Sequence, residues 1–251
     1  MNRHAWRVQQ RVNSAWQAVM SGMQTMYPAS TVRPAQPVDA FQLDAALDDD
    51  QVGFIVSPIV FNVPEKATHQ DSNLYVVMKG WLSFDGPDFV NVPLLTKSFG
   101  TEVAYFRSKL GALEHVYGAH YDLDEKAAGH PVFHAQVSPQ MGMLPFVNER
   151  FGRDIENVDN LIGKVLPNVR TPSAQMDVFA VTLQICADHL IHEDSPPKVL
   201  EAFSRMTKAC GFFMGAAHRM PHLKVAPAAH CYRSTHWYER DAGGQAAGAA
   251  A

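Results

Sequence analysis

A succession of β-rich segments between residues 52 and 138 constrains the fold of this chain more than any other feature of its sequence. Valine, isoleucine, phenylalanine and tyrosine dominate these segments, and turn residues such as Asp85-Gly86-Pro87 separate them. We expect strands at residues 52–63, with a break at Pro58, and at 74–84, 101–107, 113–123 and 130–138. Residues 89–95 should form an edge strand or a loop because of Pro93. Consecutive strands with short connections favour an antiparallel meander.

Apolar side chains change to helical spacing on both sides of the predicted sheet. Residues 5–27 place Val8, Val12 and Val19 on one face of an amphipathic helix. After the sheet, the pattern predicts helices at 154–166, from Thr171-Pro172 to about His192, and from Ser195-Pro196-Pro197 to about Ala217. The short connection between the last two helices predicts that they are antiparallel neighbours.

Strands first and helices later predict an α+β fold, in which a mostly antiparallel sheet is flanked by an N-terminal helix and C-terminal helices. The length of 251 residues fits one large domain. We expect this domain to cover residues 1–241, with helix 5–27, sheet 52–138 and a helical part at 150–217. The low-complexity residues 242–251 are expected to form a disordered tail.

The cysteines and the apolar runs bear on the cellular compartment. Cys186, Cys210 and Cys231 are odd in number and widely spaced, which suits a reducing compartment better than a disulfide framework. The N-terminus lacks the apolar run of a signal peptide, and no apolar stretch approaches the ~20 residues of a membrane helix. We therefore expect a cytoplasmic protein without a membrane partner.

Several common activities lack their sequence signature in this chain. The net charge of −4 gives no electrostatic support for tight, non-specific binding of nucleic acid. The chain has no Gly-x-x-x-x-Gly-Lys-Ser/Thr loop, no Gly-x-Gly-x-x-Gly after a strand and no Gly-x-Ser-x-Gly elbow. These absences disfavour phosphoryl transfer from ATP, dinucleotide redox chemistry and the usual serine hydrolases.

One segment, residues 118–136, concentrates histidines and carboxylates. Two strand-like runs flank a loop of small and charged residues at 124–129, which predicts a β-hairpin. Side chains alternate along a strand, so the residues that share one face are His120, Asp122 and Asp124 on the first strand and His130, His134 and Gln136 on the second.

The pairing of the two strands decides which of these side chains meet. A symmetric loop would pair residue 124 with 130, 122 with 132, and 120 with 134. A slip of one residue would scatter the cluster, because every side chain would change face. The residues between them should face the core: Tyr121, Leu123, Phe133 and Ala135.

Three kinds of chemistry fit this cluster. Imidazoles together with carboxylates bind divalent metals such as Zn²⁺ or Mn²⁺, and the candidate ligands are His120, Asp122, His130 and His134. A histidine held by an aspartate is also a competent general base, and the catalytic candidates are His120, Asp122 and His134. The third alternative is structural: these side chains cap and bridge a loop.

The same segment carries a family resemblance. His-Tyr-Asp-Leu-Asp at 120–124 and His-Pro-Val-Phe-His-Ala-Gln at 130–136 resemble the His-x-Asp…His-Pro-x-x-His signature of small uncharacterised bacterial families of unknown function. Members of such families often lie beside toxin–antitoxin or phage-defence genes. The resemblance implies that His120, Asp122, His130 and His134 are the positions to test. We favour a defence or toxin–antitoxin component that binds a protein or nucleotide partner and uses the histidines structurally, because no complete catalytic constellation is visible. The residues themselves leave open a metal-dependent phosphodiesterase or nuclease, which would act on nucleic acid or a nucleotide.

Two further groups of histidines are candidate sites. Asp188, His189 and His192 lie near the end of a predicted helix, where a histidine also suits the helix dipole. Residues 218–236 hold four histidines and Cys231, with Cys210 upstream, but no Cys-x-x-Cys pair. Arginines and aromatic residues in that segment fit either single-stranded bases or a packed arm, and we favour the arm.

Overall fold

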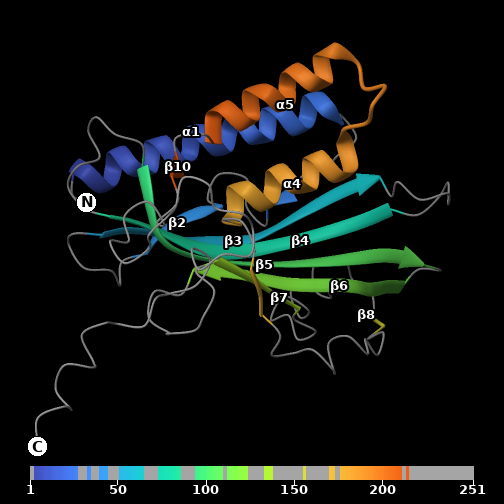
Figure 1. Cartoon of the computed structure of the whole chain (residues 1–251), viewed down its shortest axis with the longest axis horizontal. Helices are drawn as coiled ribbons and strands as arrows, with labels where there is room; N and C mark the ends of the chain where they lie inside the picture. Colours follow the sequence, from blue (N-terminus) through green and yellow to red (C-terminus); the bar gives the residue numbers. More distant parts are fainter. Residues whose placement is uncertain are drawn as a thin grey trace, which may run out of the picture.

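Three helices lie together on one face of a large sheet (Figure 1). This computed structural model describes residues 3–27, 33–34, 40–44, 51–64, 73–85, 94–109, 112–123, 133–137, 155–156, 170–172, 176–210 and 213–214. The sheet is mostly antiparallel, and helices precede and follow its central strands. The predicted α+β class is therefore confirmed.

The centre of the sheet is an antiparallel meander of four long strands. These strands are β3 (Gln51–Pro64), β4 (Asn73–Asp85), β5 (Leu94–Lys109) and β6 (Ala112–Leu123). Shorter strands extend it: β1 (Arg33–Pro34), β2 (Phe41–Asp44), β7 (Phe133–Val137), β8 (Ile155–Glu156), β9 (Arg170–Pro172) and β10 (Phe213–Met214). The order is β1-β3-β4-β5-β6-β7-β9, while β2, β8 and β10 pair with β3, β6 and β5.

Alternation along the central strands divides the sheet into two faces. On β4, Val76, Met78 and Leu82 point toward the helices and are buried in the main core. Lys79 and Trp81 lie between them in sequence and therefore point to the opposite face. We call this second side the open face, because the helices do not cover it (Figure 1).

The helices close the core from one side. Helix α4 (Val178–Leu190) packs on β3, β4 and β5, while α1 (Arg3–Met26) packs against α5 (Pro197–Cys210). An aromatic group joins these layers: Trp16 of α1 and Phe179 of α4 have ring centroids 6.2 Å apart. Phe41 of β2 lies 5.3 Å from each of them. Burial of these rings ties the first helix to the sheet.

The helix predicted from Thr171-Pro172 to about His192 begins later in the chain than expected. Residues 170–172 form β9, which pairs with β7, and helix α4 begins at Val178. Asp177 is its N-cap, because its carboxylate accepts hydrogen bonds of 3.0 Å from the backbone N–H groups of Phe179 and Ala180. The Thr-Pro pair at 171–172 was the weaker signal, since it satisfies no helical N–H group.

Three other expectations also need correction. Ile155 and Glu156 form β8, parallel to β6, so the helix predicted at 154–166 does not begin there. Helix α5 starts at Pro197 as predicted but ends at Cys210, and the chain then pairs with β5 at residues 213–214. Strand β3 continues past Pro58 through an irregularity between Val56 and Ile59, because a bulge accommodates the residue without an N–H.

Several predictions fall outside the described residues. They concern the turn at 86–87, Asp124, His130, residues 157–166, the segment 218–236 and the tail 242–251. Across the part of the chain that the structure describes, no helix has both the length and the apolar character needed to cross a membrane.

Gly80 provides a test of the packing between the sheet and α4. A Cβ atom at Gly80 would overlap the backbone carbonyl oxygen of Gly100 and press on Val178 of α4. We expect Gly80→Ala to lower the free energy of unfolding by about 1–3 kcal/mol, measured by urea denaturation, because a backbone atom cannot move aside. Gly22→Ala is the comparison, since its Cβ would meet the side chain of Met206 and alanine favours a helix. A smaller loss for Gly80→Ala than for Gly22→Ala would contradict this packing.

Candidate functional site

Strands β6 and β7 bring three of the predicted site residues together. Asp122 pairs with His134 across the two strands, and His120 pairs with Gln136. The predicted pairing of 122 with 132 and 120 with 134 is therefore wrong by two residues. A shift of two residues keeps every side chain on its face, so the cluster survives the error. Leu123 is buried in the core and Tyr121 packs against it, as predicted.

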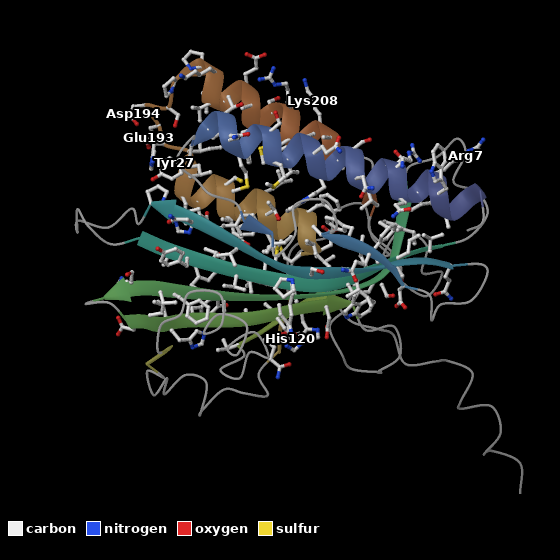
Figure 2. All side chains as sticks on the ribbon, turned by 180° about the vertical axis from the view of Figure 1, so that it is seen from behind. Arg7, Tyr27, His120, Glu193, Asp194 and Lys208 are labelled. Carbon is white, nitrogen blue, oxygen red and sulfur yellow. The ribbon has the colours of Figure 1, made fainter. Side chains whose placement is uncertain are left out.

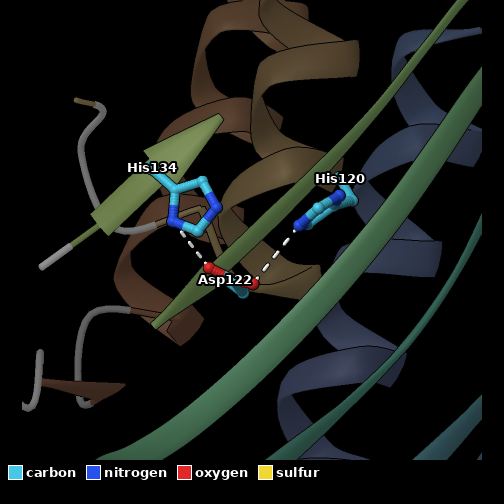
Figure 3. A group of neighbouring side chains, drawn as sticks. All are labelled: His120, Asp122 and His134. Atoms are coloured by element: carbon cyan, nitrogen blue, oxygen red, sulfur yellow. Dashed lines mark hydrogen bonds and ion pairs between the residues drawn. The ribbon is translucent and has the colours of Figure 1, made fainter. Parts of the chain in front are cut away.

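Asp122 lies between the two histidines and contacts both (Figure 3). Its Oδ1 is 2.7 Å from Nδ1 of His134, and its Oδ2 is 3.2 Å from Nε2 of His120. The two imidazole rings are 5.5 Å apart and nearly perpendicular. Asp122 and His120 have side chains that are 30% and 31% exposed, whereas His134 is 2% exposed. The carboxylate therefore connects an accessible histidine to a buried one.

The neighbouring histidines determine the charge state of Asp122. Burial alone would raise the pKa of its carboxyl group. Hydrogen bonds from His120 and His134, together with their charge, outweigh burial and hold this pKa well below its ordinary value. Asp122 is thus an anion over the whole physiological pH range.

A groove of about 850 Å³ opens beside the cluster. It lies on the open face and is lined by residues of β2 to β6, among them Lys79, Trp81, Glu102, His120 and Asp122. Figure 2 shows His120 on the side of the sheet away from the helices, whereas Lys208 of α5 lies on the outer side of the helical layer. His134 does not line the groove. It contacts Asp122 from the adjacent strand β7.

Strand pairing places the groove residues in two parallel rows that cross the sheet and continue beyond the groove onto β7. One row consists of the paired residues Ile55, Trp81, Gly100, Asp122 and His134. The adjacent row consists of Lys79, Glu102, His120 and Gln136. In the second row, the Nζ atom of Lys79 lies 3.3 Å from Oε2 of Glu102. The first row therefore has an apolar end at Ile55 and Trp81 and a polar end at Asp122, whereas the second row is polar from Lys79 to His120.

Sequence reasoning missed the part of the groove that comes from β4 and β5. The sequence pattern predicts Lys79, Trp81 and Glu102 only as strand residues. The alternation of residues 74–84 does place Lys79 and Trp81 on one face. Their proximity to His120 depends on pairings between β4, β5 and β6, which connect positions far apart in the chain.

The imidazole nitrogens and the carboxylate oxygen of the cluster are atoms that bind metals. The distances between them are somewhat different from those between the ligands of a bound metal. One ligand atom from each of His120, Asp122 and His134 lies within 4.8 Å of the others. No other group of three such residues is found among the described parts of the chain. Zinc–ligand bonds of ~2.0–2.1 Å place tetrahedral ligands about 3.3–3.5 Å apart, so binding requires a modest rotation of the side chains.

The histidines of α4 do not join this cluster. His189 lies with its ring 6.1 Å from that of Tyr105, and both belong to the helical side of the sheet. Tyr121 of β6 lies on this same side of the sheet and is close enough to α4 to feel the charge of Asp188. Burial, the nearby Tyr117 and this charge raise the pKa of Tyr121 to about 12. Beyond the helix, the backbone N–H of His192 donates to the Ser195 hydroxyl at 2.8 Å. The sheet separates this group from His120 and Asp122.

Comparison of the chain with known protein families, curated proteins and solved structures gives no match. No protein-family model matches the chain, and no curated protein or solved structure gives a significant match. The resemblance of residues 120–136 to uncharacterised defence-associated families stays a prediction.

The lowered pKa of Asp122 predicts how its contribution to stability depends on pH. A carboxyl group whose pKa is lower in the folded state stabilises the fold above its unfolded value of about 3.9, and this contribution is lost as the pH falls further. We expect Asp122→Asn to reduce the free energy of unfolding by about 1–3 kcal/mol at pH 6. The difference from the unsubstituted protein should shrink below about pH 4, measured by urea denaturation.

Glu201→Gln is a matched control for this experiment. Glu201 is an exposed carboxylate on α5 whose contact with Arg205 is 3.6 Å long. Its substitution should change stability by less than about 0.5 kcal/mol at any pH, because exposed ion pairs contribute little. A gap between Asp122→Asn and the unsubstituted protein that stays constant from pH 6 to pH 3 would exclude the proposed charge state of Asp122.

Proposed function

We propose that His120, Asp122 and His134 bind a divalent metal and that the chain is a metal-dependent hydrolase of phosphoesters, either a phosphodiesterase or a nuclease. One observation carries the proposal: three donor side chains from two paired strands meet at the polar end of an accessible groove. A rigid sheet is a suitable support for such a site, because each ligand is held by backbone pairing.

The electrostatics of the cluster favour a metal cation. Asp122 is anionic because its pKa is held below the ordinary value, so binding a cation does not require the loss of its proton. Two imidazole nitrogens and one carboxylate oxygen form a mixed donor set that suits Zn²⁺ or Mn²⁺. The groove would leave the remaining coordination positions accessible to substrate.

Metal-binding geometry requires the side chains of the cluster to move, because Oδ1 of Asp122 and Nδ1 of His134 are only 2.7 Å apart, closer than two ligands of one tetrahedral zinc. His120 is partly exposed, so its ring can rotate at little cost. His134 is buried, so the carboxylate of Asp122 would have to rotate away from it for both to bind the metal. A bound metal would polarise the phosphoryl group and neutralise its developing charge, while the residues orient it.

A metal-free mechanism is the second candidate, and the hydrogen bonds of the cluster favour it. In this arrangement Asp122 orients His120, which lines the groove and acts as the general base, and His134 positions Asp122. The partner-binding role in bacterial defence, which the sequence favours, rests on no contact in the structure and stays a prediction. The same holds for the cytoplasmic location.

Metal analysis of the purified full chain separates these candidates. We expect about one Zn²⁺ or Mn²⁺ per chain after loading and dialysis, and hydrolysis of bis(p-nitrophenyl) phosphate that a chelator abolishes. Asp122→Asn and His120→Ala should each weaken metal affinity by about 10-fold or more, because a ligand is lost. His120 is the safer position to substitute, since its side chain is partly exposed and its loss should disturb the packing less.

His115→Ala is the matched control. His115 is a buried histidine of the same strand, and its ring packs against Phe106 outside the cluster. This variant should keep the metal even if it loses stability. Hydrolysis without metal and without inhibition by chelators would favour the acid–base mechanism. Absence of both metal and hydrolysis, with only a loss of stability in the variants, would overturn both.

A further inference from the structure

The indole of Trp81 has an orientation that strand pairing imposes. Trp81 and Gly100 are directly paired across β4 and β5. A Cβ atom at Gly100 would lie 2.5 Å from Nε1 and 3.0 Å from Cε2 of Trp81, so the indole occupies the space above this glycine. The ring therefore lies over the backbone of β5, in the direction of Asp122 on the next strand. Only glycine at position 100 permits this arrangement.

The other side of this indole is available to a ligand. Trp81 is 44% exposed and lines the groove, beside Ile55, which is 50% exposed. Most other aromatic side chains of the central strands are buried, for example Phe84 and Phe99. A large, partly exposed aromatic ring at the apolar end of a groove is a surface on which a planar ring can stack.

Polar groups lie beside this surface. Lys79 and Glu102 occupy the neighbouring row, 3.3 Å apart, and both line the groove. Lys79 is a hydrogen-bond donor and Glu102 is an acceptor, so together they match the mixed donors and acceptors on the edge of a nucleobase. The groove therefore offers a stacking surface with hydrogen-bonding partners at its side.

The distance to the histidine cluster fits a nucleotide. Trp81 and Asp122 belong to strands that are separated by β5 alone, which places their backbones about 9–10 Å apart. A base stacked on the indole would direct its sugar along the row toward Asp122 and His120. The phosphate would then lie at the polar end of the groove.

We infer that the groove binds a nucleotide, with the nucleobase stacked on Trp81 beside Lys79 and Glu102 and the phosphate directed to the metal that His120 and Asp122 are proposed to hold. The position of the phosphate in this inference rests on the proposed hydrolase function, and the inference names nucleotides as the substrate class. Recognition of the base by Trp81 is independent of any metal.

Binding of a nucleoside without phosphate tests the base site alone. We expect saturable binding of adenosine to the full chain in the presence of EDTA, measured by calorimetry. Trp81→Ala should weaken it by about 5- to 150-fold, the range expected for loss of one stacked base. Trp81→Phe should restore part of the affinity, because a smaller aromatic face remains. Gly100→Ala should weaken binding although the indole is retained, because its Cβ would displace the ring.

Two controls make the outcome specific. Trp6→Ala removes another half-exposed tryptophan, on α1, and should leave adenosine binding unchanged. Ribose 5-phosphate lacks the base, so its binding should not respond to Trp81→Ala. Adenosine that fails to bind, or binds equally well to Trp81→Ala, would overturn the inference. Adenosine binding that requires Trp81 in a protein that holds no metal would support the base site while rejecting the metal-dependent hydrolase.

Discussion

Backbone pairing among β4, β5, β6 and β7 determines the position of each functional side chain in this protein. Each strand places alternate residues under the helices and on the open face, and the pairings align these alternations across the sheet. The row from Trp81 through Gly100 and Asp122 to His134 exists because three separate pairings agree. A shift of one residue in any of them would move part of this row to the core, where an unpaired carboxylate is costly.

Asp122 is the residue on which the polar end of the groove depends. It forms an ion-pair contact of 2.7 Å with a buried histidine on one side and a hydrogen bond with an accessible histidine on the other, so the carboxylate is held between two imidazoles. This explains how a carboxylate is tolerated on a partly buried strand. Asp122 also provides an anionic site beside the groove. Both the metal-dependent mechanism and the acid–base mechanism need such a site.

The open face combines two kinds of surface that a single strand could not supply. Trp81 and Ile55 form its apolar end, and Glu102, His120 and Asp122 its polar end. The helical side instead receives the large apolar residues, including Phe54, Phe61 and Phe99. The open face also carries buried apolar side chains, such as Val77 and Phe106, so the groove occupies only the part of this face around Trp81 and His120.

The amino-acid sequence by itself determined the α+β class, the long central strands, the first helix and the face on which His120, Asp122 and His134 lie. These features follow from local periodicity, since side-chain alternation and helical spacing are properties of neighbouring residues. Sequence did not determine the β6–β7 pairing, the start of α4 at Asp177, or the presence of Trp81 and Lys79 beside the cluster. Only the tertiary structure decided these, because pairing and packing energies connect residues distant in the chain and can override a local signal such as Thr171-Pro172.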